Sequence, residues 1–127
     1  MKRIVLLSFV SLALVSALAA HSLLAAFHWQ NTSVDFGKIP QSKPVKAEFR
    51  FTNKGDAPLI ITSARGSCGC TGVEYPQEAI LPGQTGLINA TFNAASVGSF
   101  SKTVTVESNA GGPTVLTMTG EVVPVNP

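Results

Sequence analysis

Apolar and polar residues alternate with a period of two along several segments of this chain. In the clearest segment, residues 45–52, apolar residues occupy every second position: Val45, Ala47, Phe49 and Phe51. An amphipathic helix would instead repeat its apolar residues every three or four positions. The alternation therefore predicts a β-strand with one face toward a core and the other toward solvent.

Turn residues separate this segment from other strand-like segments. Proline, glycine and asparagine gather at three predicted turns: 53–56, 81–84 and 109–113. Six more segments have the composition of strands: Val34–Phe36, Leu59–Ala64, Gly72–Tyr75, Gly86–Phe92, Ser99–Glu107 and Thr114–Val123. The Leu59–Ala64 segment is apolar enough to be buried on both faces. About seven short strands without a convincing helix predict an all-β fold, an immunoglobulin-like antiparallel β-sandwich.

The first residues have the composition of an export signal. Lys2 and Arg3 precede an apolar run over residues 4–20, and this run ends in small residues. We therefore expect residues 1–20 to be a signal peptide and the domain that follows to be periplasmic or secreted.

The small residues at the end of this run place the cut after Ala19 or Ala20. A later cut near Ala25 or Ala26 is a second alternative. A third is an uncleaved anchor, because a run extended to Phe27 would reach the roughly 20 residues that a membrane span needs.

Removal of the signal changes the size and charge of the protein. Taking 20 residues from 127 leaves 107, enough for one domain with a single core. We expect a lead over residues 21–32 and the sandwich over 33–123.

The chain has nine Lys and Arg against seven Asp and Glu, and the signal takes away Lys2 and Arg3. The neutral remainder has no basic surface of the nucleic-acid-binding kind, and we expect no stable membrane insertion after cleavage.

The two cysteines of the chain lie one residue apart, in Ser67-Cys68-Gly69-Cys70-Thr71. Cysteines of exported proteins usually form disulfides. In a regular strand, however, residues i and i+2 are about two 3.3 Å steps apart, whereas a disulfide needs Cβ atoms about 3.5–4.5 Å apart. A Cys68–Cys70 disulfide therefore requires a sharp bend at Gly69, and we expect Gly69, Ser67 and Thr71 to shape the loop. The small ring would be strained and easily reduced.

Other uses of the two thiols remain open. They could be free and buried, or they could pair with another thiol. Thiolates at Cys68 and Cys70 could also bind copper or zinc, although His28 and Met118 are the only other plausible soft donors after the signal. A further alternative is thiol–disulfide exchange, for which Arg65 is a nearby cation in the sequence.

No pattern of catalytic residues accompanies the cysteines. The seven carboxylates are scattered, and no glycine-rich phosphate loop is present. We therefore expect a protein that is not an enzyme and has no catalytic residues or cofactor, with copper or zinc as the alternative.

A series of motifs follows in order along residues 34–122: Phe36-Gly37-Lys38-Ile39-Pro40, Phe49-x-Phe51-x-Asn53-x-Gly55, Pro58-Leu59-x-Ile61, Ser67-Cys68-Gly69-Cys70-Thr71, Pro82-Gly83 and Gly98-x-Phe100. This series resembles a bacterial family of exported domains of unknown function. The family is similar in layout to the immunoglobulin-like domains of the major sperm protein, PapD-like and ASPM/SPD-2/Hydin groups.

The resemblance implies a sandwich fold and export, and members of the wider group act mainly as scaffolds and partner-binding modules, some through strand addition at a sheet edge. The family itself has no established activity, so the function is inferred from the fold, the neutral charge and the missing catalytic groups. We therefore expect a non-catalytic binding or scaffold module of the bacterial cell envelope, with another envelope or secreted protein as its partner. The alternative is a soft-metal or thiol redox module that uses Cys68 and Cys70.

Overall fold

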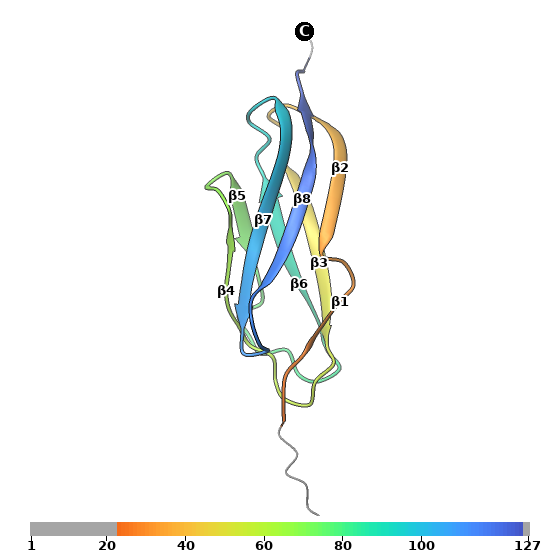
Figure 1. The fold of residues 1–127 in the computed structure, drawn as a ribbon, viewed down its shortest axis with the longest axis vertical. Helices are drawn as coiled ribbons and strands as arrows, with labels where there is room; N and C mark the ends of the chain where they lie inside the picture. The colour runs from red at the N-terminus through yellow and green to blue at the C-terminus, as the bar shows by residue number, and fades with distance from the viewer. Residues whose placement is uncertain (1–22, 126–127) are drawn as a thin grey trace, which may run out of the picture.

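The computed structural model describes residues 23–125, which form eight β-strands (Figure 1). In chain order the strands are β1 (Phe27–Trp29), β2 (Ser33–Pro40), β3 (Val45–Asn53), β4 (Ile61–Gly66), β5 (Thr71–Glu74), β6 (Thr85–Phe92), β7 (Gly98–Ser108) and β8 (Thr114–Val123). The predicted signal peptide, residues 1–20, lies outside the described residues. Within residues 23–125, no helix has the length and apolar character to cross a membrane.

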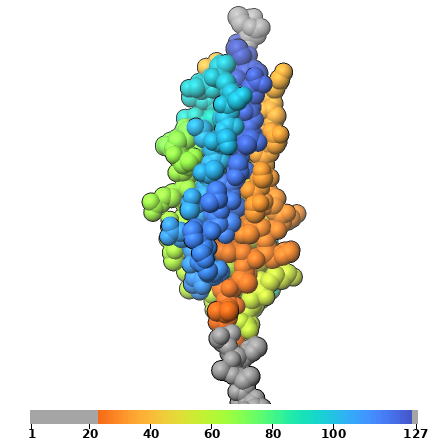
Figure 2. Space-filling view, viewed as in Figure 1, coloured from red at the N-terminus to blue at the C-terminus, as the bar shows by residue number. Residues whose placement is uncertain are grey.

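The strands form two four-stranded sheets that pack face to face. One sheet has the order β1-β3-β6-β5 and the other the order β2-β8-β7-β4. All neighbours are antiparallel except β2 and β8, which are parallel. Strands β2, β8 and β7 lie side by side across the face shown in Figure 2. The predicted all-β sandwich is therefore confirmed.

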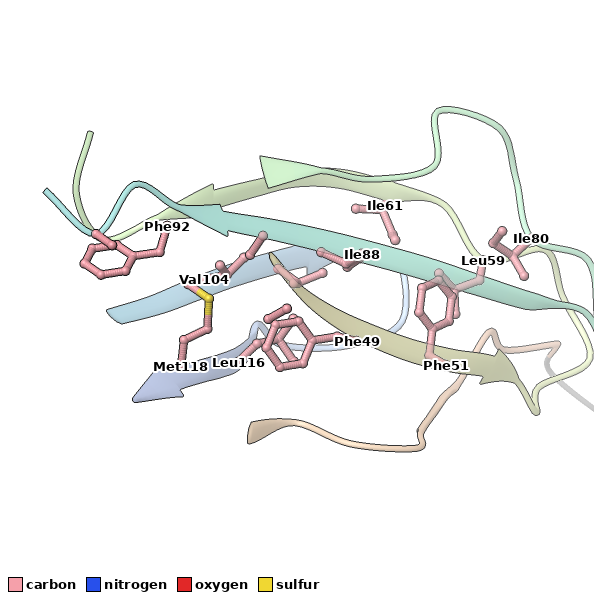
Figure 3. Close-up of a cluster of buried hydrophobic side chains, with 14 of the residues drawn as sticks. Phe49, Phe51, Leu59, Ile61, Ile80, Ile88, Phe92, Val104, Leu116 and Met118 are labelled. Atoms are coloured by element: carbon pink, nitrogen blue, oxygen red, sulfur yellow. The ribbon is translucent and has the colours of Figure 1, made fainter. Parts of the chain in front are cut away.

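The core lies between the sheets and comes from the alternation seen in the sequence. Its largest fully buried apolar side chains, most of them labelled in Figure 3, are Phe49, Phe51, Leu59, Ile88, Val104, Val106, Leu116, Met118 and Val122. Burial of one such side chain stabilises the fold by roughly 1.5–3 kcal/mol. The inward positions of β3, β6, β7 and β8 thus account for most of the hydrophobic stabilisation.

The chain enters the sandwich at one end and leaves it at the other (Figure 1). Phe27 pairs with Asn53, the last residue of β3. At the opposite end of the sandwich, Pro40 pairs with Val123, the last residue of β8. The loops of the sandwich therefore divide into an entry end and an exit end.

Residues of the expected lead over residues 21–32 are part of the fold, because Phe27–Trp29 forms strand β1. Phe27 stacks on Trp29 with ring centroids 4.7 Å apart and meets Phe51 edge-on at 5.0 Å. This aromatic cluster holds the three-residue strand β1 against β3.

Hydrogen bonds also tie the residues before β1 to the β3–β4 turn. The N–H of Leu24 donates to the Asp56 carboxylate across 2.7 Å, and its carbonyl accepts from the Asp56 N–H across 2.9 Å. The carbonyl of Ala26 accepts from the N–H of Lys54 across 2.9 Å. A cut near Ala25 or Ala26 would remove Leu24 and these hydrogen bonds.

Asn53 is a fully buried polar residue at the end of β3, where the sequence indicates only a turn. Its amide nitrogen donates to the carbonyls of Ala57 and Ile80 across 2.8 and 2.9 Å. Its side-chain oxygen accepts from the N–H groups of Gly55 and Ala26 across 2.9 and 3.3 Å. The carboxamide of Asn53 therefore forms hydrogen bonds with four backbone groups at the entry end of the sandwich, where buried polar groups need partners.

The strand predicted at Leu59–Ala64 differs from the structure in position and burial. Strand β4 spans Ile61–Gly66 and lies at the edge of its sheet. Leu59 is fully buried, but Ile60 is 45% exposed. The prediction that this run is buried on both faces is wrong, because every strand of a two-layer sandwich has one face toward the other sheet and one face toward solvent.

Candidate functional site

The cysteine motif forms the turn between β4 and β5, which belong to different sheets. Gly66, the last residue of β4, lies against Thr71, the first residue of β5. A Cβ atom at Gly66 would stand 2.9 Å from the Cβ of Thr71, too close for another side chain. The chain therefore crosses between the sheets in a tight passage that requires glycine at position 66.

Cys68 and Cys70 form a disulfide within this turn, with their Cα atoms 5.2 Å apart. The N–H of Thr71 donates to the carbonyl of Cys68 across 3.2 Å, so the backbone bends back over three residues. This bend brings the two sulfurs together, as an extended strand would not. Of the alternatives that the sequence left open, the structure adopts the internal disulfide, and it has no free thiol within residues 23–125.

The structure places the three residues that we expected to shape the loop. Ser67 anchors it to β7, because its N–H donates to the Thr103 carbonyl across 2.8 Å and its hydroxyl accepts from the Thr103 N–H across 3.1 Å. Thr71 is buried beneath the turn. Gly69 has no left-handed φ, and a Cβ there would meet nothing within 4 Å. The loop-shaping role of Gly69 stays a prediction.

The two sulfurs have different surroundings. The Sγ of Cys68 accepts a hydrogen bond from the N–H of Cys70 across 3.3 Å. It also lies 3.7 Å from the hydroxyl oxygen of Thr71. A disulfide sulfur carries no proton, so the Thr71 hydroxyl is the donor of this second contact. Cys68 is therefore the sulfur on which two hydrogen-bond donors converge.

Cys70 faces a different environment. Its carbonyl accepts from the N–H of Asn93 across 3.1 Å, which ties the turn to the end of β6. Its side chain is half-buried and packs against the core. It also contributes to a small open pocket of about 140 Å³, whose wall is made by Cys70, Phe92, Asn93, Ala95, Ser96 and Lys102. Phe92 marks this end of the core in Figure 3.

Lys102 gives the pocket a positive charge. It lies on β7 two positions before the core residue Val104, so it is on the face of the strand that points toward the core. Its Nζ atom lies 5.8 Å from the centroid of the Phe92 ring. The sequence contains the signal for this residue, because Lys102 interrupts an otherwise apolar alternation of Phe100, Val104 and Val106. Arg65, the cation that the sequence suggested, is exposed on β4.

The other suggested soft donors do not gather at the cysteines. His28 pairs with Thr52 near the entry end of β3, whereas Thr71 pairs with Phe92 opposite Val45, the first residue of β3. Met118 is fully buried in the core. In the part of the chain that the structure describes, no three of its His, Cys, Asp and Glu residues are placed to hold a metal ion.

Comparison with solved structures identifies several similar folds. A protein of unknown function from Porphyromonas gingivalis W83 has a TM-score of 0.67 and 16% identity, over 77% of this chain and 47% of that one. The chain thus spans about half the length of that protein. The ASH/PapD-like domain 7 of human CEP192 has a TM-score of 0.64 and 10% identity, over 91% of this chain and 98% of that one. The YadV chaperone has a TM-score of 0.58 and 16% identity, over 76% and 51%.

These likenesses establish a PapD-like, immunoglobulin-like fold, since identities this low carry the fold alone. Among curated proteins, none matches the sequence significantly. The family model described as a protein of unknown function (DUF1573) matches residues 27–122, which include every strand from β1 to β7 and nearly all of β8. The chain therefore belongs to the DUF1573 family.

Proposed function

We propose that this protein is a non-catalytic, exported binding or scaffold module of the bacterial cell envelope, whose partner is another envelope or secreted protein. The observation that supports the proposal is the free edge of the sheet β1-β3-β6-β5 at β5. An edge strand offers unpaired backbone groups to a strand of another chain. YadV, which has a similar fold, is named as a chaperone, which supports the class of function but not a particular partner.

The register of β5 indicates which backbone groups are available for such an added strand. Asn93 donates to the carbonyl of Cys70, and Gly72 stands opposite Thr91 two residues further along. In an antiparallel ladder, hydrogen-bonded pairs alternate with non-bonded pairs. The N–H and carbonyl of Val73 are therefore directed away from β6, where a partner strand could bond to them.

A pull-down from envelope extract with two matched variants tests this edge. Val73→Pro removes the outward N–H, whereas Val73→Ala shortens the same side chain and keeps the N–H. We expect the wild-type protein and Val73→Ala to retain a crosslinked partner and Val73→Pro to lose it, with all three folded by circular dichroism. Equal recovery by Val73→Pro, or no partner for the wild type, would contradict the proposal.

Export has its own test. The intact mass of the protein recovered from the periplasm should correspond to a chain that begins at Ala20 or His21. A mass that includes residues 1–19, or retention of the protein in the cytoplasm, would argue against export through a cleaved signal.

A second candidate function is thiol redox chemistry at Cys68 and Cys70, and the observation that favours it is the disulfide itself. A disulfide between residues only two positions apart stabilises a fold little. Stability alone therefore does not account for this disulfide. Copper or zinc binding would first require reduction, because only thiolates ligate these metals.

Reduction followed by metal titration separates the two uses of the cysteines. For a redox module, we expect the reduced protein to be reoxidised to the internal disulfide by oxidised glutathione, and Cys68→Ser and Cys70→Ser to stop at a mixed disulfide. Stoichiometric uptake of Cu(I) or Zn by the reduced wild type, lost in both variants, would favour the metal site instead.

A further inference from the structure

We propose that the Cys68–Cys70 disulfide reacts with thiols in one direction: an incoming thiolate enters the Lys102 pocket and bonds to Cys70, and Cys68 leaves as the thiolate. This inference rests on the second candidate function, thiol redox chemistry, and adds the site of attack and the class of substrate. The substrate class is a thiol that carries negative charge beside its sulfur.

The surroundings of Cys68 favour it as the leaving group. When a thiolate attacks a disulfide, the departing sulfur takes the electron pair of the broken bond, and exchange is faster when that thiolate is better stabilised. The Cys70 N–H and the Thr71 hydroxyl already donate to Sγ of Cys68 across 3.3 and 3.7 Å. Hydrogen bonds to a charged acceptor are stronger than those to a neutral one, so both contacts gain strength as the charge develops.

The surroundings of Cys70 favour it as the sulfur that is attacked. Cys70 contributes to the wall of an open pocket, and the pocket volume of about 140 Å³ is well above the roughly 10–15 Å³ that a cavity needs to hold one water molecule. A group the size of a cysteine side chain therefore has room to approach. Lys102 lines the same pocket, and its positive charge attracts an anion into this space.

The exchange balances without any other reactant. The thiolate sulfur of the incoming molecule forms a bond to Sγ of Cys70, the Cys68–Cys70 bond breaks, and its electron pair stays on Cys68. The products are a mixed disulfide at Cys70 and a thiolate at Cys68. A second thiolate of the same partner can then attack the partner's sulfur in the mixed disulfide, and Cys70 leaves as the thiolate. The partner then carries a disulfide, and Cys68 and Cys70 are both reduced.

The position of the mixed disulfide tests the direction. The purified oxidised protein is mixed with mercaptoethanesulfonate, quenched early with acid, alkylated and sequenced by tandem mass spectrometry, which separates Cys68 from Cys70 at Gly69. We expect the thiol adduct on Cys70 and the alkyl group on Cys68. A majority of adduct on Cys68, or an equal split, overturns the proposed direction and leaves the redox function standing. No reaction with any thiol contradicts the redox function as well.

The charge of the attacking thiol tests the pocket. After correction for the thiolate fraction, we expect mercaptoethanesulfonate to react faster than mercaptoethanol, and mercaptoethanol faster than cysteamine. Lys102→Met should slow the anionic thiol about five-fold, the effect of one solvent-screened charge at contact distance, and Lys102→Arg should restore the rate. Lys54→Met, at the entry end, should match the wild type. An unchanged rate in Lys102→Met removes Lys102 from the proposal.

A cysteine-containing peptide distinguishes a protein substrate from a small thiol. A short acidic peptide with one cysteine should form the same adduct on Cys70 at a rate comparable to that of mercaptoethanesulfonate. A peptide that fails to react while the small thiol succeeds would limit the site to small-molecule thiols, and it would overturn a role toward protein cysteines.

Discussion

Lys102 and Phe92 meet across the sandwich, with the Nζ atom of Lys102 lying 5.8 Å from the centroid of the Phe92 ring. The two residues belong to different sheets, since Lys102 is on β7 and Phe92 is on β6. Lysine is rarely found on the inward face of a strand unless its charged end reaches solvent or a partner. The open pocket at this end of the core provides such an exit.

We predict that Lys102 contributes little to stability. Lys102→Met keeps an unbranched stem against Phe92 and loses only a cation–π contact, which is worth about 0.5–1 kcal/mol at exposed sites. The free energy of unfolding should therefore change by no more than about 1 kcal/mol in a urea titration followed by the fluorescence of Trp29, the single tryptophan. A loss well above this value would give Lys102 a structural role. Lys54→Met is the matched control.

We predict that reduction of Cys68 and Cys70 leaves the sandwich folded. In the chain-entropy description, a ring this short lowers the entropy of the unfolded chain by an amount worth about 1.5 kcal/mol, below the effect of most structural disulfides. Urea titrations of the oxidised and reduced protein should differ by about that value, and the double variant Cys68→Ser, Cys70→Ser should follow the reduced form. Unfolding on reduction would mean that the disulfide holds β4 and β5 together.

We predict that Asn53→Ala is among the most destabilising single changes in the chain. It removes one hydrogen bond from each of four backbone groups at the entry end. The Ile80 carbonyl keeps the N–H of Leu59 as a second donor, whereas each buried group left without a partner costs about 1–3 kcal/mol. The expected loss is about 3–5 kcal/mol in the free energy of unfolding.

Asn89→Ala is the control for that change, because the side-chain oxygen of Asn89 is buried without a hydrogen-bond partner. The same substitution there should cost about 1 kcal/mol or less. Similar losses for Asn53→Ala and Asn89→Ala would show that the hydrogen bonds of Asn53 are not the source of its effect.

We predict that Gly66→Ala disturbs the β4–β5 passage. The added methyl group would meet the Cβ of Thr71 at 2.9 Å, and such overpacking costs about 1–3 kcal/mol. Gly72→Ala adds the same methyl group one residue beyond Thr71, where nothing lies within 4 Å, and should stay within about 0.5 kcal/mol of the wild type. Thermal unfolding of both variants measures the difference, and equal melting temperatures would contradict the steric account.

The sequence predicted most of the fold because strands that face one core leave a strong alternation. The predicted bounds of β8, Thr114–Val123, are those of the structure, and those of β3 and β6 agree closely. The short strand β1 left no such mark, since its three residues adjoin the apolar N-terminal run. Phe27–Trp29 become a strand because their rings pack on Phe51, a contact between residues more than 20 positions apart.

The candidate site was only half visible in the sequence. The spacing of the cysteines identified Cys68 and Cys70 as a candidate site. Strand geometry predicted that the backbone must bend sharply between them to form a disulfide. The hydrogen-bond donors around Sγ of Cys68 depend on the shape of one turn, and the pattern of apolar and polar residues does not predict that shape. Lys102 was visible as a charge at an apolar position, but its nearness to Cys70 depends on how two sheets face each other.

The entry and exit ends lie at opposite ends of the sandwich, and this placement sets how far the cysteine turn is from any group attached before Leu24. Strand β3 has nine residues, so the two ends are separated by about 30 Å at the usual rise per residue. Anything attached ahead of Leu24 is held at the far end from the cysteine turn. A protein tethered by its N-terminal side would therefore present its disulfide at the end away from the tether.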